Sequence, residues 1–134
     1  MDKFGKLAPR AGTNARYRHD QWLMAVVTNL EFNANRVFAC DYFFDKGADT
    51  DAKRANAIEN LDNWLPTFNA RLEKSPYLSG SEFQLCDLIC TTVLRHVVEK
   101  GYADKYPAVK AYVMRNMDRP TFQRMNAKNG VKQG

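Results

Sequence analysis

The two histidines are the side chains best suited to acid–base chemistry or to metal binding. His19 stands between Arg18 and Asp20 on what we expect to be the exposed face of a helix, so we interpret it as a surface residue. His96 stands beside an apolar seam, where its ring either is satisfied at the edge of the core or lines a cleft. The two histidines are far apart in the sequence, and a zinc site needs several ligands close together. We therefore expect no metal.

The three cysteines offer a second kind of chemistry. Cys86 and Cys90 are spaced i, i+4 and share one helix face, where two thiols could bind a soft metal or be oxidised. No further ligand accompanies them, and free cysteine behaves as a small hydrophobic side chain. We expect both of them, and Cys40 at the end of an apolar stripe, to be buried in the core. An odd number of cysteines fits a reducing compartment better than a disulfide framework, so we predict a cytoplasmic protein.

Apolar residues recur with helical spacing in the first third of the chain, which predicts a long helix from Thr13 to about Phe44. Thr13 is a suitable N-cap, and Gly47 can adopt the left-handed conformation that ends a helix. The expected buried stripe steps by four residues and comprises Trp22, Val26, Leu30, Ala34 and Phe38.

A second helix is predicted to begin at one of residues 49–51, which are all competent N-caps. Pro66 lies inside this helix and removes one backbone hydrogen bond, so we expect either a kink or a break there. The expected buried seam comprises Ile58, Leu61, Leu65, Phe68 and Leu72.

Further helical segments follow a loop at residues 75–81. The third helix is expected to end at Gly101, the fourth to begin with Pro107 in its first turn, and a short helix after Pro120 to hold Phe122 and Met125. No segment alternates like a strand for long enough to count. We predict one all-α bundle of about five helices over residues 1–134, with a frayed tail at 128–134. The expected seams of the third and fourth helices are Leu85, Leu88, Ile89, Thr92, Val93 and Val97, and Val109, Tyr112, Val113 and Met117.

The composition is that of an ordinary globular domain, 45% hydrophobic and 26% charged over 134 residues. No apolar run reaches the roughly 18 to 20 residues that span a membrane, so we expect no membrane association. The net charge of +5 is uneven, with +4 over residues 1–19, −5 over 20–99 and +6 over 100–134. Basic ends favour anionic partners, but motifs for nucleic-acid binding are missing. We interpret the charge as solvated surface and expect no nucleic acid.

Residues 77–88, YLSGSEFQLCDL, resemble the glutathione S-transferase signature YLxGxxFSLAD(I/L). KYPAV at 105–109 and MDRPTF at 117–122 resemble the pattern that follows it in that family. Residues 7–13, the pairs at 16–17 and 22–23, and TVLR at 92–95 are similar to bacterial, beta-class enzymes. Residues 1–10 resemble the end of the thioredoxin-like domain and the linker that precede the helical domain. The resemblance therefore implies a C-terminal helical domain that lacks the thioredoxin-like domain.

The family signature implies a folding motif at the start of the third helix. In the family a Ser or Thr caps this helix, an acid three residues later bonds back to it, and flanking apolar residues form a hydrophobic staple. The matching residues here are Gln84, the acid Asp87, and the staple pair Phe83 and Leu88. Gln84 is a poor cap, and Ser81 with Gln84 offers a competing capping box one turn earlier. We expect Asp87 to be structural rather than catalytic.

The resemblance also implies a division of chemistry between two domains. The thioredoxin-like domain of the family holds glutathione and the side chain that activates it, and the helical domain supplies the pocket for an electrophilic, hydrophobic co-substrate. The pocket candidates implied here are Met24, Thr28, Asn29, Glu31, Phe32 and His96. We expect no catalytic residue in this chain, and glutathione as a cofactor only if a thioredoxin-like domain is present.

Several of these candidates depart from the beta-class patterns WLNxxxxELHKG and TVLRW. Glu31 replaces a histidine and Phe32 a lysine, so two cationic groups are lost and one carboxylate is gained. A carboxylate near the glutathione sulfur opposes formation of the thiolate. The other replacements are Met24 for Asn, Asn29 for Glu and His96 for Trp.

Three functions remain open at this point. The chain is the co-substrate half of a glutathione transferase, or a stand-alone helical module for protein association, or a protein that binds a hydrophobic small molecule. The aromatic run at residues 42–44 fits either a pocket or a face for a partner. The partners that we expect are a second copy of the chain or a thioredoxin-like domain.

Overall fold

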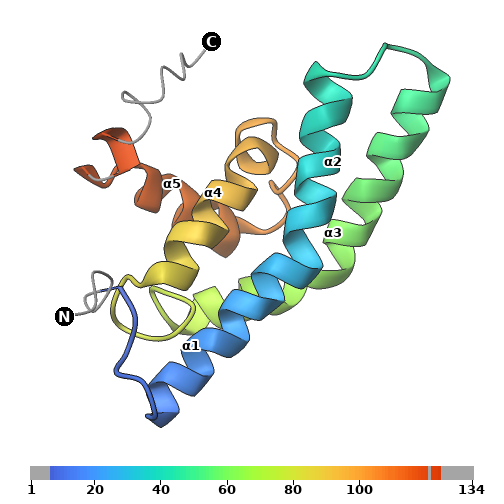
Figure 1. The fold of residues 1–134 in the computed structure, drawn as a ribbon. Helices are drawn as coiled ribbons and strands as arrows, with labels where there is room; N and C mark the ends of the chain where they lie inside the picture. The colour runs from blue at the N-terminus through green and yellow to red at the C-terminus, as the bar shows by residue number, and fades with distance from the viewer. Residues whose placement is uncertain (1–6, 121, 125–134) are drawn as a thin grey trace.

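The computed structural model describes residues 7–120 and 122–124, and within these ranges all regular structure is helical (Figure 1). The five α-helices of this part of the chain confirm the predicted all-α class. Phe122 is buried in a short helical stretch after α5. Met125, residues 1–6 and the predicted frayed tail at 128–134 lie outside the described residues. The elements are α1 (Asn14–Ala25), the π-helical turn η1 (Val26–Leu30), α2 (Glu31–Tyr42), α3 (Ala48–Lys74), α4 (Leu85–Glu99) and α5 (Pro107–Met117).

The predicted first helix is a continuous rod made of α1, η1 and α2 (Figure 1). Thr13 caps it as expected, because its side-chain oxygen accepts the backbone N–H of Arg16 at 3.2 Å. The rod ends at Tyr42, two residues earlier than predicted. It contains a π-helical turn, which the apolar pattern did not predict.

The buried stripe of this rod is only partly the predicted one. Val26, Leu30 and Ala34 are buried, but Phe38 is 41% exposed. The reason is geometric, because each step of four residues turns an α-helix by about 40° beyond a full circle. After several steps the side chain has left the core, and the buried position passes to Val37 and Cys40.

The second predicted helix, α3, begins at Ala48 with Gly47 as its N-cap, just before the predicted window, and runs through Pro66 without a break. Pro66 has no N–H to donate to the carbonyl of Asp62. Asp62 instead binds groups from the segment before α5, with Tyr106 donating its hydroxyl to the carboxylate at 2.9 Å and Lys105 lying at 2.8 Å. Burial and the hydrogen bond to Asp62 raise the pKa of Tyr106 to about 12, so its hydroxyl stays a donor.

The N-terminus of α5 is capped by a side chain from another helix. Pro107 occupies the first turn, as predicted. The amide oxygen of Asn69 in α3 accepts the backbone N–H groups of Ala108 and Val109 at 3.0 and 3.1 Å. Two otherwise unpaired donors of a helix end are thereby satisfied.

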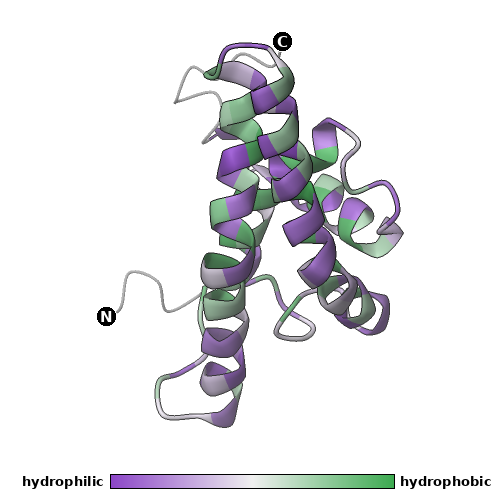
Figure 2. Ribbon diagram, turned by 90° about the vertical axis from the view of Figure 1, so that its right-hand side faces the viewer, coloured by the Kyte–Doolittle hydropathy of each residue, from purple (hydrophilic) through white to green (hydrophobic). Residues whose placement is uncertain are grey.

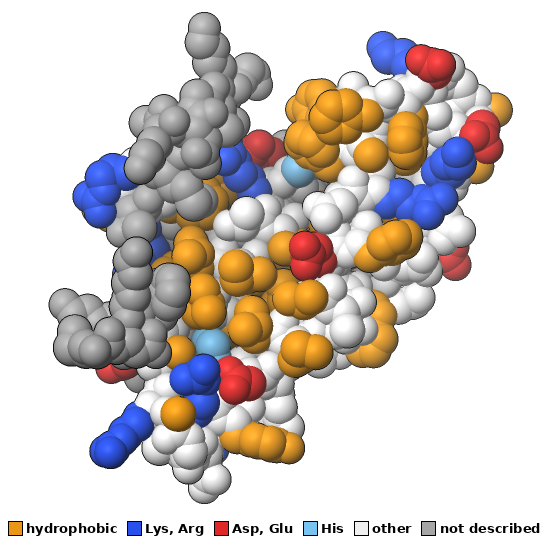
Figure 3. All heavy atoms as spheres, viewed as in Figure 1, with side chains coloured by type: hydrophobic (Ala, Val, Ile, Leu, Met, Phe, Trp, Pro, Cys, Tyr) orange, Lys and Arg blue, Asp and Glu red, His pale blue; other side chains and the backbone are white. Residues whose placement is uncertain are grey.

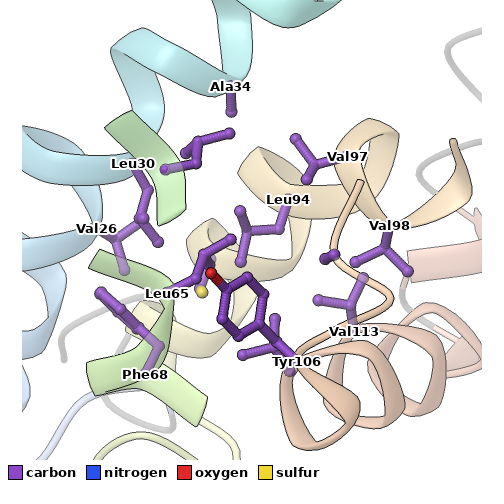
Figure 4. Close-up of a cluster of buried hydrophobic side chains, with 14 of the residues drawn as sticks. Val26, Leu30, Ala34, Leu65, Phe68, Leu94, Val97, Val98, Tyr106 and Val113 are labelled. Carbon is purple, nitrogen blue, oxygen red and sulfur yellow. The ribbon is translucent and has the colours of Figure 1, made fainter. Parts of the chain in front are cut away.

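The hydrophobic core lies where the rod of α1, η1 and α2 meets α3, α4 and α5 (Figure 4). In the close-up, Leu30 of the first rod, Leu65 of α3 and Leu94 of α4 point toward one another. Figure 2 shows hydrophobic and hydrophilic residues alternating along the helices, as expected of amphipathic helices packed on one core. Gly101, with a φ of 81°, ends α4 in the left-handed conformation expected of it.

The face that α4 buries is only partly the predicted one. Its fully buried residues are Cys86, Asp87, Cys90, Thr91, Leu94, Val97 and Val98. Of the predicted seam only Val97 is buried, whereas Leu88, Ile89 and Val93 are half-buried and Thr92 is exposed. This helix is apolar on two sides, so helical periodicity could not decide which side faces the core. The second apolar side remains at the surface.

Candidate functional site

The six pocket candidates fall into separate places on the structure. Met24 is 59% exposed, and the hydroxyl of Thr28 donates to the Met24 carbonyl one turn before it. Asn29 and Glu31 are half-buried. In the part of the chain that the structure describes, no hydrogen bond or ring contact joins His96 to any of the other five candidates.

Phe32 lines a groove on the outer side of α2 and α3. The groove has a volume of about 360 Å³ and contains two cations next to two aromatic rings. The guanidinium of Arg36 lies 5.9 Å from the Phe32 ring centre, and the ammonium of Lys53 lies 5.5 Å from that of Phe44. The lining residues are Phe32, Asn35, Arg36, Phe44 and Lys53.

His96 belongs to a polar cluster that ties three helices together, here called the His96 cluster (Asp41, Arg54, His96 and Tyr102). Nε2 of His96 lies 2.6 Å from Oδ2 of Asp41. Nε of Arg54 in α3 donates to Oδ1 of Asp41 at 2.7 Å, and the Tyr102 hydroxyl lies 3.3 Å from Oδ2. The side chains of His96 and Asp41 are 13% and 10% exposed. The ring of His96 is thus satisfied at the edge of the core, as one of the two expectations for it had it.

The electrostatics of the His96 cluster favour an ionised carboxylate. Burial alone would raise the pKa of Asp41, but hydrogen bonds from His96 and Arg54 outweigh it and hold the pKa below its usual range. Burial, and after it the Asp41 carboxylate, raise the pKa of Tyr102, so the phenol remains a hydrogen-bond donor. Because Asp41 accepts at Nε2, the other ring nitrogen of His96 is the one available for further contacts.

Aromatic rings lie next to His96. The ring centres of Phe38 and Tyr42 lie 5.1 and 5.3 Å from that of His96, and both rings are largely exposed. The Lys100 ammonium lies 5.7 Å from the Tyr42 ring centre. Flat apolar walls beside one polar ring and one cation suit an aromatic molecule that carries a hydrogen-bond acceptor.

Sequence reasoning missed Asp41 and misplaced His19. His19 is 1% exposed, so its interpretation as a surface residue is wrong. The sequence did contain a signal for both residues, which is helical spacing from the apolar stripe. His19 stands three and seven residues before positions 22 and 26, and Asp41 stands four and seven residues after positions 37 and 34. A polar residue on an apolar stripe needs a buried partner, which the pattern itself does not identify.

The capping motif of α4 forms at Gln84 and not at Ser81. Gln84 is the N-cap, and its backbone N–H donates to Oδ2 of Asp87 at 2.9 Å. Phe83 and Leu88 occupy the N′ and N4 positions of a hydrophobic staple. Ser81 is exposed and precedes the cap, so the competing box one turn earlier does not form. Asp87 is structural, as expected, because its carboxylate is buried in bonds to the protein.

The cysteines are buried, as predicted. Burial raises the pKa of the Cys86 thiol to about 12 and that of Cys90 further still, so neither is a nucleophile near neutral pH. Within the described residues, no three metal-binding side chains of the His, Cys, Asp and Glu types come together. None of the described helices is long and apolar enough to cross a membrane.

A family model described as the C-terminal domain of glutathione S-transferase matches residues 27–120. Glutathione S-transferase 1 of Zea mays is 36% identical over 85 residues, which are 60% of this chain and 40% of that protein. Glutathione S-transferase 2 of Triticum aestivum is 38% identical over 72 residues, 52% of this chain and 25% of that protein. The chain thus spans less than half the length of these curated relatives.

Solved structures give the same match at the level of the fold. A glutathione transferase from Methylococcus capsulatus superposes with a TM-score of 0.76 at 27% identity, over 95% of this chain and 60% of that one. The glutathione transferase URE2P6 from Phanerochaete chrysosporium, solved with oxidised glutathione, has a TM-score of 0.79 at 16% identity, over 96% of this chain and 60% of that one. At that identity the second likeness shows the fold alone.

Proposed function

Because the chain belongs to the family of glutathione S-transferase C-terminal domains, we propose that it forms the co-substrate pocket of a glutathione transferase. A thioredoxin-like domain would hold glutathione, and this helical domain would hold the hydrophobic electrophile. Beta class is the finer assignment that we propose, on the motifs at residues 7–23 and 92–95. A cytoplasmic location is proposed on the three unpaired cysteines.

The observation that carries the proposal is the second apolar side of α4. Leu88, Ile89 and Val93 are half-buried, although no described helix covers them fully. Figure 3 shows hydrophobic side chains spread across this face of the molecule, over α4 and the neighbouring rod of α1, η1 and α2. An apolar surface shared by two helices is typical of a binding site rather than of a free surface.

The His96 cluster supplies the polar end of the proposed pocket. Asp41 holds the His96 ring in place, while Phe38 and Tyr42 offer rings on which a planar molecule can stack. Of the pocket candidates, His96 therefore has the strongest support. Met24, Thr28, Asn29 and Glu31 follow the same rod, and Phe32 belongs to the outer groove instead.

Catalysis by this chain alone has little chemical support. Conjugation requires a glutathione thiolate next to the electrophile. Glu31 would add negative charge at the position where the beta-class pattern has a histidine. The buried thiols of Cys86 and Cys90 cannot act as nucleophiles in their protonated form. We propose that the chain binds the co-substrate and that the thioredoxin-like domain activates glutathione.

The purified chain is expected to bind a hydrophobic probe and to leave glutathione unreacted. Fluorescence titration should show 8-anilinonaphthalene-1-sulfonate binding, weakened about five- to tenfold by Phe38→Ala, because a stacked ring contributes about 1 kcal/mol. The matched control is Trp64→Ala, which removes an exposed ring on α3. The chain should neither bind glutathione-agarose nor conjugate glutathione to 1-chloro-2,4-dinitrobenzene. Turnover by the chain alone would show that its site is complete. If Phe38→Ala and Trp64→Ala bound the probe with equal affinity, the proposed pocket at Phe38 would be contradicted.

Association between copies is a second candidate function, and the outer groove favours it. Phe32 is 66% exposed beside Phe44, Arg36 and Lys53, and aromatic rings with arginine are typical of protein interfaces. Light scattering after size exclusion is expected to give the mass of a dimer, and Phe32→Glu to give a monomer. Tyr17→Glu, at an exposed ring of α1, is the control that should remain dimeric. A monomeric wild-type chain would exclude this candidate.

A further inference from the structure

His19 of α1 uses both nitrogens of its ring, and one of them bridges to α4. Nε2 lies 3.1 Å from the backbone nitrogen of Cys86 and accepts its N–H. Cys86 is the second residue of α4, and such first-turn N–H groups have no partner within their own helix. Nδ1 lies 3.0 Å from Oδ1 of Asp20. A histidine that is 1% exposed therefore caps a helix far from it in the sequence.

This arrangement requires one form of the imidazole ring. A nitrogen that accepts an N–H carries no proton itself, so the ring is neutral and its single proton is on Nδ1. That proton is donated to Asp20, whose carboxylate also pairs with Arg16 at 3.1 Å. The bridge between the two helices thus exists only while Nε2 is unprotonated.

We propose that His19 is a pH-sensitive latch between α1 and α4, closed when its ring is neutral and opened when Nε2 takes up a proton. Histidine is the side chain whose charge ordinarily changes between pH 5 and 8. Once Nε2 carries a proton, two N–H donors face each other and the Cys86 amide loses its acceptor. The new positive charge also lies at the N-terminal, positive end of α4.

Among the described residues, no charged group near the latch can replace the lost acceptor. Asp20 is on the Nδ1 side, half-exposed and already bound to Arg16. Asp87 of α4 is close, with its Oδ2 atom 3.9 Å from the Cys86 sulfur, but its oxygens already accept from Leu78, Gln84 and Tyr112. Burial keeps the Cys86 thiol protonated, with its pKa raised to about 12. The turn η1, which continues α1 along the rod, has no ionisable side chain.

The latch joins α4 to α1, and these helices carry the apolar surface that we propose as the co-substrate pocket. Opening it frees the first turn of α4 from α1, while the Leu85 N–H remains bonded to the carbonyl of Leu7. Acid would thus loosen one edge of that face and leave the rest of the core in place. This inference holds whatever molecule the face binds.

The direct test is nuclear magnetic resonance of the chain between pH 8 and 5. The backbone amide resonance of Cys86 should shift with the same midpoint as the ring resonances of His19, because one event changes both. A midpoint shared with His96 instead, or a Cys86 amide that does not move while His19 titrates, would overturn the latch.

Urea unfolding supplies an independent measurement, made in a His96→Gln background so that His19 is the one remaining histidine. Between pH 7.5 and 5.5 the folding equilibrium constant of H96Q should fall about five- to tenfold. A loss of this size corresponds to the contribution of one hydrogen bond to stability. Adding His19→Gln keeps an amide oxygen within reach of the Cys86 N–H but removes the titrating group. The H19Q/H96Q chain should lose little over this range, and an equal loss in both chains contradicts the proposal.

Discussion

Replacing Asp87 with alanine is expected to destabilise the chain by about 3–5 kcal/mol, because three hydrogen-bond donors lose their acceptor at about 1–3 kcal/mol each. The carboxylate is fully buried and accepts three hydrogen bonds. Two come from the backbone N–H groups of Leu78 and Gln84, each at 2.9 Å, and one from the hydroxyl of Tyr112 at 2.7 Å. Asp87→Ala leaves all three donors without this acceptor, and the Leu78 and Tyr112 donors are buried. Urea unfolding of D87A at pH 7 measures the loss.

Two further variants show whether the loss of stability in D87A comes from its hydrogen bonds or merely from removing an acidic residue. Tyr112→Phe removes one of the three hydrogen bonds and should cost about 1 kcal/mol. Glu82→Ala removes an exposed carboxylate in the loop before α4 and should stay within about 0.5 kcal/mol of wild type. A D87A protein that unfolds like E82A would show that Asp87 does not hold the 77–84 loop to α4 and α5.

Replacing Asp41 with alanine is expected to cost about 2–3 kcal/mol at pH 7, because it leaves His96 and Arg54 without their shared acceptor. The loss should depend on pH. The pKa of Asp41 is below its ordinary value of 3.8, since hydrogen bonds from His96 and Arg54 outweigh the effect of burial. A lowered pKa contributes stability that is complete above the ordinary value and disappears as the pH falls through the folded value.

The difference in unfolding free energy between wild type and D41A should therefore shrink as the pH falls below 3.8. Urea unfolding across this range measures it. Asp45→Ala, at an exposed acid of the next loop, is the matched control and should show no such dependence. A difference between wild type and D41A that did not shrink below pH 3.8 would contradict the assigned role of the carboxylate.

Some of the fold followed directly from local sequence signals. Thr13 caps the first helix, Gly101 ends α4, and Pro107 begins α5, because each of these residues acts within one turn of its own helix. The motif at residues 77–88 likewise placed the family correctly, since its residues act on one another at short range. Such signals do not depend on what the helix packs against.

The faces of the helices were harder to predict. Phe38 was expected in the core and is exposed, and α4 buries Thr91 and Leu94 while Leu88 and Val93 are only half-buried. When a helix is apolar on two sides, its pattern is compatible with either orientation. The choice is made by the shape of the neighbouring helices, which the pattern does not contain.

The sequence by itself determined the all-α class, the helix ends at Thr13, Gly101 and Pro107, and the family, because these depend on residues close together in the chain. Only the tertiary structure decided which polar side chains work together. Arg54 meets Asp41 across 13 residues, Asn69 caps α5 across 39, and His19 caps α4 across 67. Contacts of this kind form only when packing brings distant helices together, so the His96 cluster and the His19 latch belong to the fold and not to any local motif.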